Sequence, residues 1–154
     1  LGKDQLVDNH LRVEHNGPNC DSREFYRGVL DENSKSVFTG RIYVKEDAQQ
    51  TDAKQTNQNI LLSDDAQATS RPQLEIYADD VACTHGATTG EIDDEAMLYL
   101  QTRGIPADAA RTLLIYAFLN ESLDELADDA FRTVLVEELL ANLPGGEFIR
   151  SLYL

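Results

Sequence analysis

The sequence predicts a mainly β fold with added α-helices, in which a β-rich segment precedes a small helical domain. Residues 1–90 contain short runs of alternating apolar and polar residues, and Gly, Asn, Asp and Ser separate these runs. Such alternation is typical of strands with one buried face, and no helical pattern interrupts it. From residue 91 onward, apolar residues recur at the spacing of amphipathic helices. We therefore expect two domains, residues 1–90 and residues 91–154.

Two strands are predicted most clearly, at residues 37–44 and 73–78. Each places alternate apolar side chains on one face, which is the face that a sheet would bury. The inward residues that we expect are Phe38, Gly40, Ile42, Val44, Leu74, Ile76 and Ala78. Weaker strand patterns occupy residues 11–15, 25–30 and 59–62.

Many short strands without intervening helices permit a sandwich, a barrel or a β-solenoid. Residues 57–59 favour the solenoid, because amide side chains stack well where each strand pairs with the turns above and below it. No strict repeat period is visible in the sequence. The pattern alone therefore leaves all three architectures open.

About three helices are expected in residues 91–154. Asp93 is a suitable N-cap for the first helix, because its side chain can accept hydrogen bonds from free backbone amides, and Gly104 is a suitable stop. Pro106 stands near the start of a second helix, where proline is favoured. The apolar stripe of this helix comprises Ala110, Leu113, Leu114, Ala117 and Phe118.

The sequence Ser122-Leu123-Asp124-Glu125 has the capping-box pattern and predicts the start of a third helix there. Its expected apolar stripe comprises Leu126, Ala130, Val134 and Leu139, and it ends near Pro144. The second helix is apolar around most of its circumference, including Ile115 and Tyr116. That is more apolar surface than one small core needs, which suggests a partner protein.

Composition excludes several function classes. The formal net charge is −15 with no local basic patch, which argues against binding to nucleic acid or anionic membranes. The longest strongly apolar run, residues 113–119, is too short to cross a bilayer. Cys20 and Cys83 lie far apart, so a reducing, cytoplasmic compartment is expected. The chain begins at Leu1 within a pattern, so we expect a fragment of a longer protein. No nucleotide-binding or catalytic motif is present, and we expect no enzymatic activity.

Two residues that can bind iron or zinc stand two positions apart in Cys83-Thr84-His85. In a strand, positions i and i+2 point to the same face, so the thiol and the imidazole would lie side by side. A nearby imidazolium would lower the pKa of the thiol. Two ligands cannot complete a tetrahedral site, so further ligands would come from elsewhere, such as another subunit. The alternative is a buried structural cysteine beside an incidental histidine.

Several segments of the sequence resemble the SufB/SufD family of the SUF iron–sulfur cluster assembly system. The most specific is PQLEIYADDVACTHGATTG at residues 72–90, and EAMLYLQTRGI follows at residues 95–105. Upstream, YRGVLD, VFTGRI and NILLSDDA begin at residues 26, 37 and 59. The resemblance covers about residues 10 to 120. The Cys-x-His-Gly form of residues 83–86 is similar to the SufD branch rather than the SufB branch.

The resemblance implies a right-handed parallel β-helix, represented here by its C-terminal turns, followed by a C-terminal helical domain. It also implies a scaffold subunit that pairs with SufB through the β-helix and binds the ABC-type ATPase SufC through the helices. Cys83 and His85 match family positions at the SufB–SufD interface, where they would contribute ligands to a nascent iron–sulfur cluster. The helical stripe Ala110, Leu113, Leu114, Ala117 and Phe118 would belong to the SufC docking region.

The implied cofactor is a transient iron–sulfur cluster at the subunit interface, which we do not expect on this fragment alone. We expect that such a fragment is able to homodimerise through the surface meant for SufB. Two alternatives remain. This subunit could be a purely architectural partner of SufB and SufC, with all cluster ligands supplied by SufB. A polysaccharide lyase or glycosidase on a β-helix would need paired acidic residues along a substrate groove, and the cysteine usage and the family resemblance argue against it.

Overall fold

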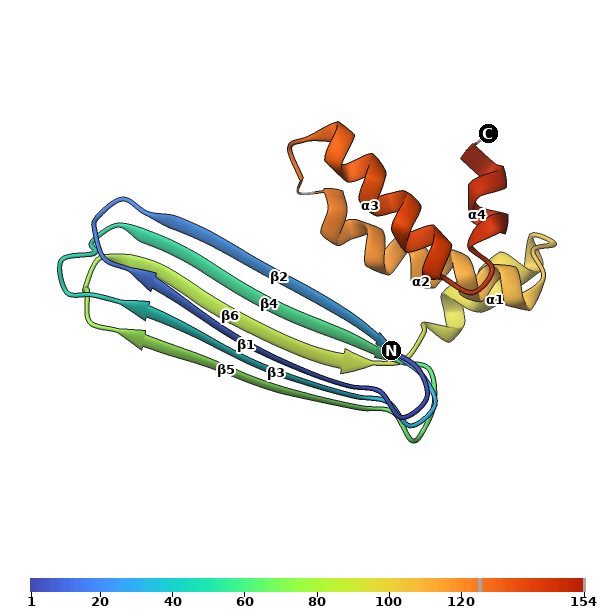
Figure 1. Cartoon of the computed structure of the whole chain (residues 1–154), viewed down its shortest axis with the longest axis horizontal. Helices are drawn as coiled ribbons and strands as arrows, with labels where there is room; N and C mark the ends of the chain where they lie inside the picture. Colours follow the sequence, from blue (N-terminus) through green and yellow to red (C-terminus); the bar gives the residue numbers. More distant parts are fainter. Residues whose placement is uncertain (125, 154) are drawn as a thin grey trace. The chain divides into compact units, whose positions relative to one another are not determined.

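The computed structural model describes residues 1–124 and 126–153. The chain divides into two compact units, Leu1–Gly90 and Glu91–Leu154. The first unit contains all the strands that the described residues form, and the second contains the helices (Figure 1).

Six strands of nearly equal length make up the first unit. They are β1 (Leu6–His15), β2 (Asp21–Leu30), β3 (Lys35–Val44), β4 (Thr51–Leu61), β5 (Gln67–Ile76) and β6 (Val81–Gly90). Figure 1 shows them as two layers, with β1, β3 and β5 in one and β2, β4 and β6 in the other.

Each of the first four strands pairs with the strand two places later in the chain. The two sheets have the orders β1-β3-β5 and β2-β4-β6, and all four pairings are parallel. Leu6 pairs with Lys35, and Lys35 in turn pairs with Gln67, so the separation between partners differs slightly from one turn to the next. The chain therefore alternates between two sheets with a repeat length that is not constant. This variation explains why the sequence shows no strict period.

The predicted inward face of β3 is confirmed. Phe38, Ile42 and Val44 are each at most 2% exposed. Ile42 and Val44 form a core cluster with alanines from outside β3, namely Ala48, Ala53 and Ala78. Leu74 packs against this cluster as expected. Ile76 shares the inward register position of Val44, as predicted, but it is 39% exposed because it is the last residue of the edge strand β5.

Strand β4 is much longer than the pattern at residues 59–62 predicted. It begins at Thr51, and its inward positions are largely polar, with Gln55, Asn57 and Asn59 at most 5% exposed. Asn57 Nδ2 donates to Ser70 Oγ over 2.5 Å, and Asn59 Nδ2 donates to Asn57 Oδ1 over 3.3 Å. Because these buried side chains are hydrophilic, hydrophobic alternation could not locate the strand.

Glycine is required where the Gln55 side chain crosses the interior. Gly40 on β3 is buried, and a Cβ atom built there would lie within 2.6 Å of Gln55 Nε2, Cδ and Oε1. The absence of a side chain on one sheet therefore makes room for an amide from the other sheet.

Four helices form in the described residues of the second unit. They are α1 (Asp94–Thr102), α2 (Ala107–Asp124), α3 (Asp129–Asn142) and α4 (Gly146–Tyr153). Asp93 caps α1 by accepting from the backbone amides of Glu95 and Ala96, as predicted. Gly104 has a φ of +86° just beyond the end of α1, a conformation that favours glycine. None of the helices in this described part is long and apolar enough to cross a membrane.

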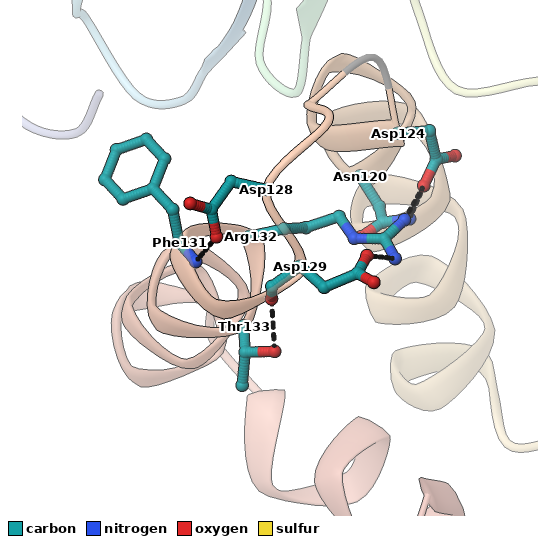
Figure 2. Close-up of polar contacts among 7 residues, drawn as sticks. All are labelled: Asn120, Asp124, Asp128, Asp129, Phe131, Arg132 and Thr133. Atoms are coloured by element: carbon teal, nitrogen blue, oxygen red, sulfur yellow. Dashed lines mark hydrogen bonds and ion pairs between the residues drawn. The ribbon is translucent and has the colours of Figure 1, made fainter.

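The predicted start of the third helix is wrong. Ser122 lies inside α2, where its hydroxyl donates to the carbonyl of Leu119 over 2.6 Å, and Glu125 lies outside the described residues. Helix α3 instead begins after Asp128, whose carboxylate accepts from the Phe131 amide over 2.9 Å (Figure 2). Asp128 thus accepts a hydrogen bond from a free backbone amide at the start of α3. The sequence had assigned this capping role to Ser122.

Arg132 connects the two helices that flank this turn. Its guanidinium lies 2.8 Å from Asp129 Oδ1 and 3.9 Å from Asp124 Oδ1 at the end of α2 (Figure 2). The later start also changes the apolar stripe. Ala130 and Val134 are exposed rather than buried, and Leu140 joins Tyr116 and Ile149 in the core, with Leu113, Val136, Leu139 and Leu143 packed against it.

Replacing Gly40 with alanine is expected to lower the free energy of unfolding of the β unit by about 1–3 kcal/mol, because the new methyl group overlaps the buried Gln55 amide. Chemical denaturation measures the change. Gly86→Ala is the matched control, since a Cβ built there would have no heavy atom within 4 Å among the described residues beyond its own chain neighbours. Equal losses in the two variants would contradict the packing described here.

The two candidate caps of α3 can be separated by hydrogen exchange. Asp128→Ala is expected to cost about 1 kcal/mol in local helix stability, so that the Phe131 amide exchanges faster. Ser122→Ala should leave that amide unchanged, because Ser122 only back-bonds within α2. Faster exchange in the Ser122 variant would instead favour the capping box.

Candidate functional site

Cys83 and His85 lie on β6, which pairs with β4 and is an edge strand of its sheet. Cys83 is opposite Ala53 and His85 is opposite Gln55. Both of these β4 partners are buried. Positions two apart on a strand share a face, so Cys83 and His85 are neighbours on one face of β6, as the sequence predicts. The register shows that this is the inward face.

These two positions continue rows that run across the whole sheet. One row contains Ser22 on β2, Ala53 on β4 and Cys83 on β6. The adjacent row contains Glu24, Gln55 and His85. The two β6 side chains therefore have an apolar and a polar neighbour, respectively.

Cys83 is half-buried and packs against the core cluster that contains Ala53. This burial raises the pKa of the Cys83 thiol above its ordinary value, and the negative charge of Asp52 acts in the same direction. A backbone hydrogen bond at Ala53 lowers the pKa, and its effect is smaller than that of burial but larger than that of Asp52. The pKa of this thiol therefore rises rather than falls, and His85 is not among the groups that shift it. The free chain holds Cys83 mainly in the protonated form until a metal ion or a base removes its proton.

His85 is exposed, although it occupies an inward position. The reason is its place in the sheet, because no strand of the described residues covers the outer side of β6. The imidazole is therefore accessible to a ligand or partner, whereas Gln55, the preceding member of its row, is covered on both sides.

The described residues contain no group of three or more His, Cys, Asp or Glu side chains that could hold a metal ion. Cys83 and His85 thus offer at most two ligands of the thiolate and imidazole types that bind iron.

The helical stripe that the sequence singled out lies partly in the core. Ala110 is fully buried, and Leu113 packs against the cluster of Tyr116, Leu140 and Ile149. Leu114 and Phe118 are half-buried and Ala117 is exposed. Ile115 and Tyr116 are also buried, so much of the apparent surplus of apolar surface on α2 belongs to the core of the helical unit itself.

Glu24 and Gln55 were missed in the sequence. Gln55 Nε2 donates to Glu24 Oε2 over 3.4 Å, and both residues precede His85 in its row. The signal that could have found them is the nearly regular spacing of Glu24, Gln55 and His85 along the chain. Hydrophobic patterning does not detect that repeat.

The raised pKa of Cys83 predicts slow alkylation near neutral pH. In a Cys20→Ser background, maleimide labelling of Cys83 should reach half its maximal rate at a higher pH in the folded chain than in denaturant, because the thiolate is the reacting form. Asp52→Asn should move this midpoint down, since the Asp52 charge raises the pKa. The exposed Asp79→Asn is the control. A folded midpoint at or below the denatured one would overturn the assignment.

The comparisons with known proteins all identify the same family. Residues 1–118 match the model of the SUF system FeS cluster assembly SufBD core domain. The chain is 40% identical over 144 residues to the iron-sulfur cluster assembly protein SufD of Escherichia coli (strain K12), which covers 94% of this chain and 34% of the relative.

Two further relatives agree with this match. An iron-sulfur cluster assembly SufBD family protein of Synechocystis sp. is 38% identical over 79% of this chain and 27% of its own length. The SufD protein of Bacillus subtilis (strain 168) is 30% identical over 88% of this chain and 31% of its own length. The chain spans about a third of the length of these curated relatives. The resemblance found in the sequence is confirmed, and the chain belongs to the SufBD family of the SUF system as a SufD-type member.

Proposed function

We propose that this chain is part of a scaffold subunit for iron–sulfur cluster assembly that has no catalytic turnover of its own. The observation that carries the proposal is the placement of Cys83 and His85 side by side on β6, which is an edge strand of its parallel sheet within the described residues, in a chain of this family. The thiol and imidazole can be offered to a cluster that a second subunit helps to hold.

The β unit is proposed to be the C-terminal part of a right-handed parallel β-helix. Support comes from the parallel pairing of every second strand, which makes each pair of consecutive strands one turn of a coil. Connections between parallel strands of one sheet are right-handed in nearly all proteins, which favours that hand here.

Pairing with a SufB-type subunit through this coil is the second part of the proposal. Strands β5 and β6 each pair on one side only within the described chain. Their other sides offer backbone amides and carbonyls that strands of a partner could pair with. A partner seated there would adjoin Cys83 and His85 and could supply the remaining ligands.

The C-terminal helices are proposed to bind an ABC-type ATPase of the SufC type. The helical unit exposes several large apolar side chains that its own core does not use, and apolar patches of this kind mark partner surfaces. They are Leu98, Tyr99, Phe131, Val134, Phe148 and Leu152. Of the stripe on α2, only Ala117 is fully available, with Leu114 and Phe118 half-buried.

The cluster is proposed to be cargo, built at the subunit interface and passed on. Soft thiolate and imidazole ligands suit iron, and a two-ligand site on one subunit holds a cluster weakly enough to release it. The chain alone is therefore expected to retain no cluster. A reducing compartment such as the cytoplasm fits the two free cysteines.

A purely architectural role is the second candidate, in which a SufB-type subunit supplies every ligand. The raised pKa of the Cys83 thiol favours it, because a protonated thiol is a poor ligand. Either role is compatible with the isolated fragment pairing with a second copy through the free edges of β5 and β6.

The deciding experiment uses the full-length subunit co-expressed with SufB- and SufC-type partners. Cys83→Ala and His85→Ala are each expected to leave recovery of the complex unchanged and to reduce iron–sulfur absorbance after reconstitution about ten-fold or more, by analogy with the loss of a metal ligand or its support. Thr84→Ala, on the opposite face of β6, is the control. Normal cluster assembly in both variants would establish the architectural role and reject the ligand assignment.

A further inference from the structure

A polar row crosses the interior of the β unit and ends at the candidate site. It consists of Glu24 on β2, Gln55 on β4 and His85 on β6, which are consecutive partners in the parallel register. Neighbouring strands in a sheet lie about 4.8 Å apart, so side chains that share a register position and a face stack on one another. Gln55 therefore has Glu24 as its register neighbour on one side and His85 on the other.

The orientation of the Gln55 amide follows from its first neighbour. Its Nε2 donates to Glu24 Oε2 over 3.4 Å. An ionised carboxylate can only accept hydrogen bonds, so the amide nitrogen, rather than the amide oxygen, faces Glu24. The carbonyl oxygen Oε1 of Gln55 therefore does not take part in the contact with Glu24.

Gln55 Oε1 is buried and accepts no hydrogen bond within the described part of the chain, and the residue as a whole is 1% exposed. Buried carbonyl oxygens are normally paired. The amide cannot swing far to find another donor, because it lies against the backbone at Gly40, with no space even for a Cβ atom between them. The next residue in the row with an N–H to give is His85.

We propose that Gln55 is a positioning residue for His85: when the exposed imidazole turns inward, its N–H donates to Gln55 Oε1, which accepts no hydrogen bond from the described residues as they stand. That bond selects one tautomer and directs the other ring nitrogen, with its lone pair, toward a ligand at the free edge of β6. Glu24 supports it by accepting from the same amide, which polarises the carbonyl group. Histidines that bind metals generally have their second nitrogen held in this way. That the ligand is cluster iron rests on the proposed function. The preference of His85 for one tautomer does not depend on that function.

The test measures the tautomer directly in the metal-free chain. Long-range ¹H–¹⁵N correlation spectra of the ¹⁵N-labelled protein, recorded in alkaline buffer where imidazoles are neutral, report which ring nitrogen carries the proton. The signals of His85 are identified by their loss in His85→Gln. One tautomer should dominate in the unchanged chain.

Gln55→Met keeps the length of the side chain and removes both polar groups. We expect it to change the His85 tautomer ratio by roughly two- to ten-fold, the effect of one net hydrogen bond. Asn57→Leu is the matched control, because Asn57 is also a buried amide on β4 but its register partner on β6 is Ala87. An unchanged ratio in Gln55→Met, or an equal change in Asn57→Leu, would overturn the proposal.

Folding is monitored in the same spectra through His15, which is buried and lies 3.1 Å from Ser22 Oγ. If His15 shows that Gln55→Met is unfolded, Gly40→Ala replaces it, since the added methyl displaces the Gln55 amide without deleting it. Gly40→Ala should then change the ratio in the same direction, and an unchanged ratio would reject the proposal.

Cluster assembly separates this inference from the proposed function. In the reconstituted complex, Gln55→Met should lower iron–sulfur absorbance by about ten-fold relative to Asn57→Leu. If His85→Ala leaves assembly normal, the proposed ligand role fails while the tautomer result stands. If His85→Ala abolishes assembly but Gln55→Met changes neither the tautomer nor the yield, only the positioning role fails.

Discussion

Parallel pairing between each strand and the strand two places later is the interaction on which the rest of this structure depends. It determines which side chains point inward, because a partner in register has the same orientation as the residue it faces. It also brings residues from successive turns into one row, as with Glu24, Gln55 and His85. Finally, it leaves one side of β6 without a partner strand among the described residues, which exposes His85 while Cys83 stays partly covered. A shift of this pairing by a single position would turn both side chains outward.

The interior that this pairing creates has an apolar cluster at one end and a stretch of buried amides further along. Ile42 and Val44 form the apolar part with three alanines, whereas Gln55, Asn57 and Asn59 bring amides into the interior. Buried amides contribute little net stability, but a shifted register would leave them unpaired, so they help to specify a single alignment. The same polar surroundings accommodate Glu24 as a member of the row that contains His85, where its carboxylate accepts from Gln55.

The sequence allowed the prediction of strands and helices whose apolar residues recur at a regular spacing, and of helix starts marked by an N-cap residue. The inward face of β3, the N-cap Asp93 and the shared face of Cys83 and His85 could all be predicted. Prediction failed where the interior is polar, as in the first part of β4, and where two caps compete, as with Ser122 and Asp128. The rise in the pKa of Cys83 could not be predicted, because it comes from burial against β4 and from Asp52, which is distant in the sequence. Which residues support His85 likewise depends on a register that local patterns do not contain.

The near-constant strand length has a consequence for how such a chain can change its length during evolution. The six strands are almost equal in length, and the difference between successive turns falls largely in the short connectors. Three of these connectors contain a residue with positive φ, namely Asn19, Glu32 and Gln50. A single insertion inside a strand would reverse the orientation of every later side chain in that strand, whereas one in a connector would be absorbed locally. Insertions and deletions should therefore be tolerated in the connectors, or as a complete repeat of two consecutive strands with their connectors. This two-strand repeat is the unit by which the length of the fold can grow or shrink.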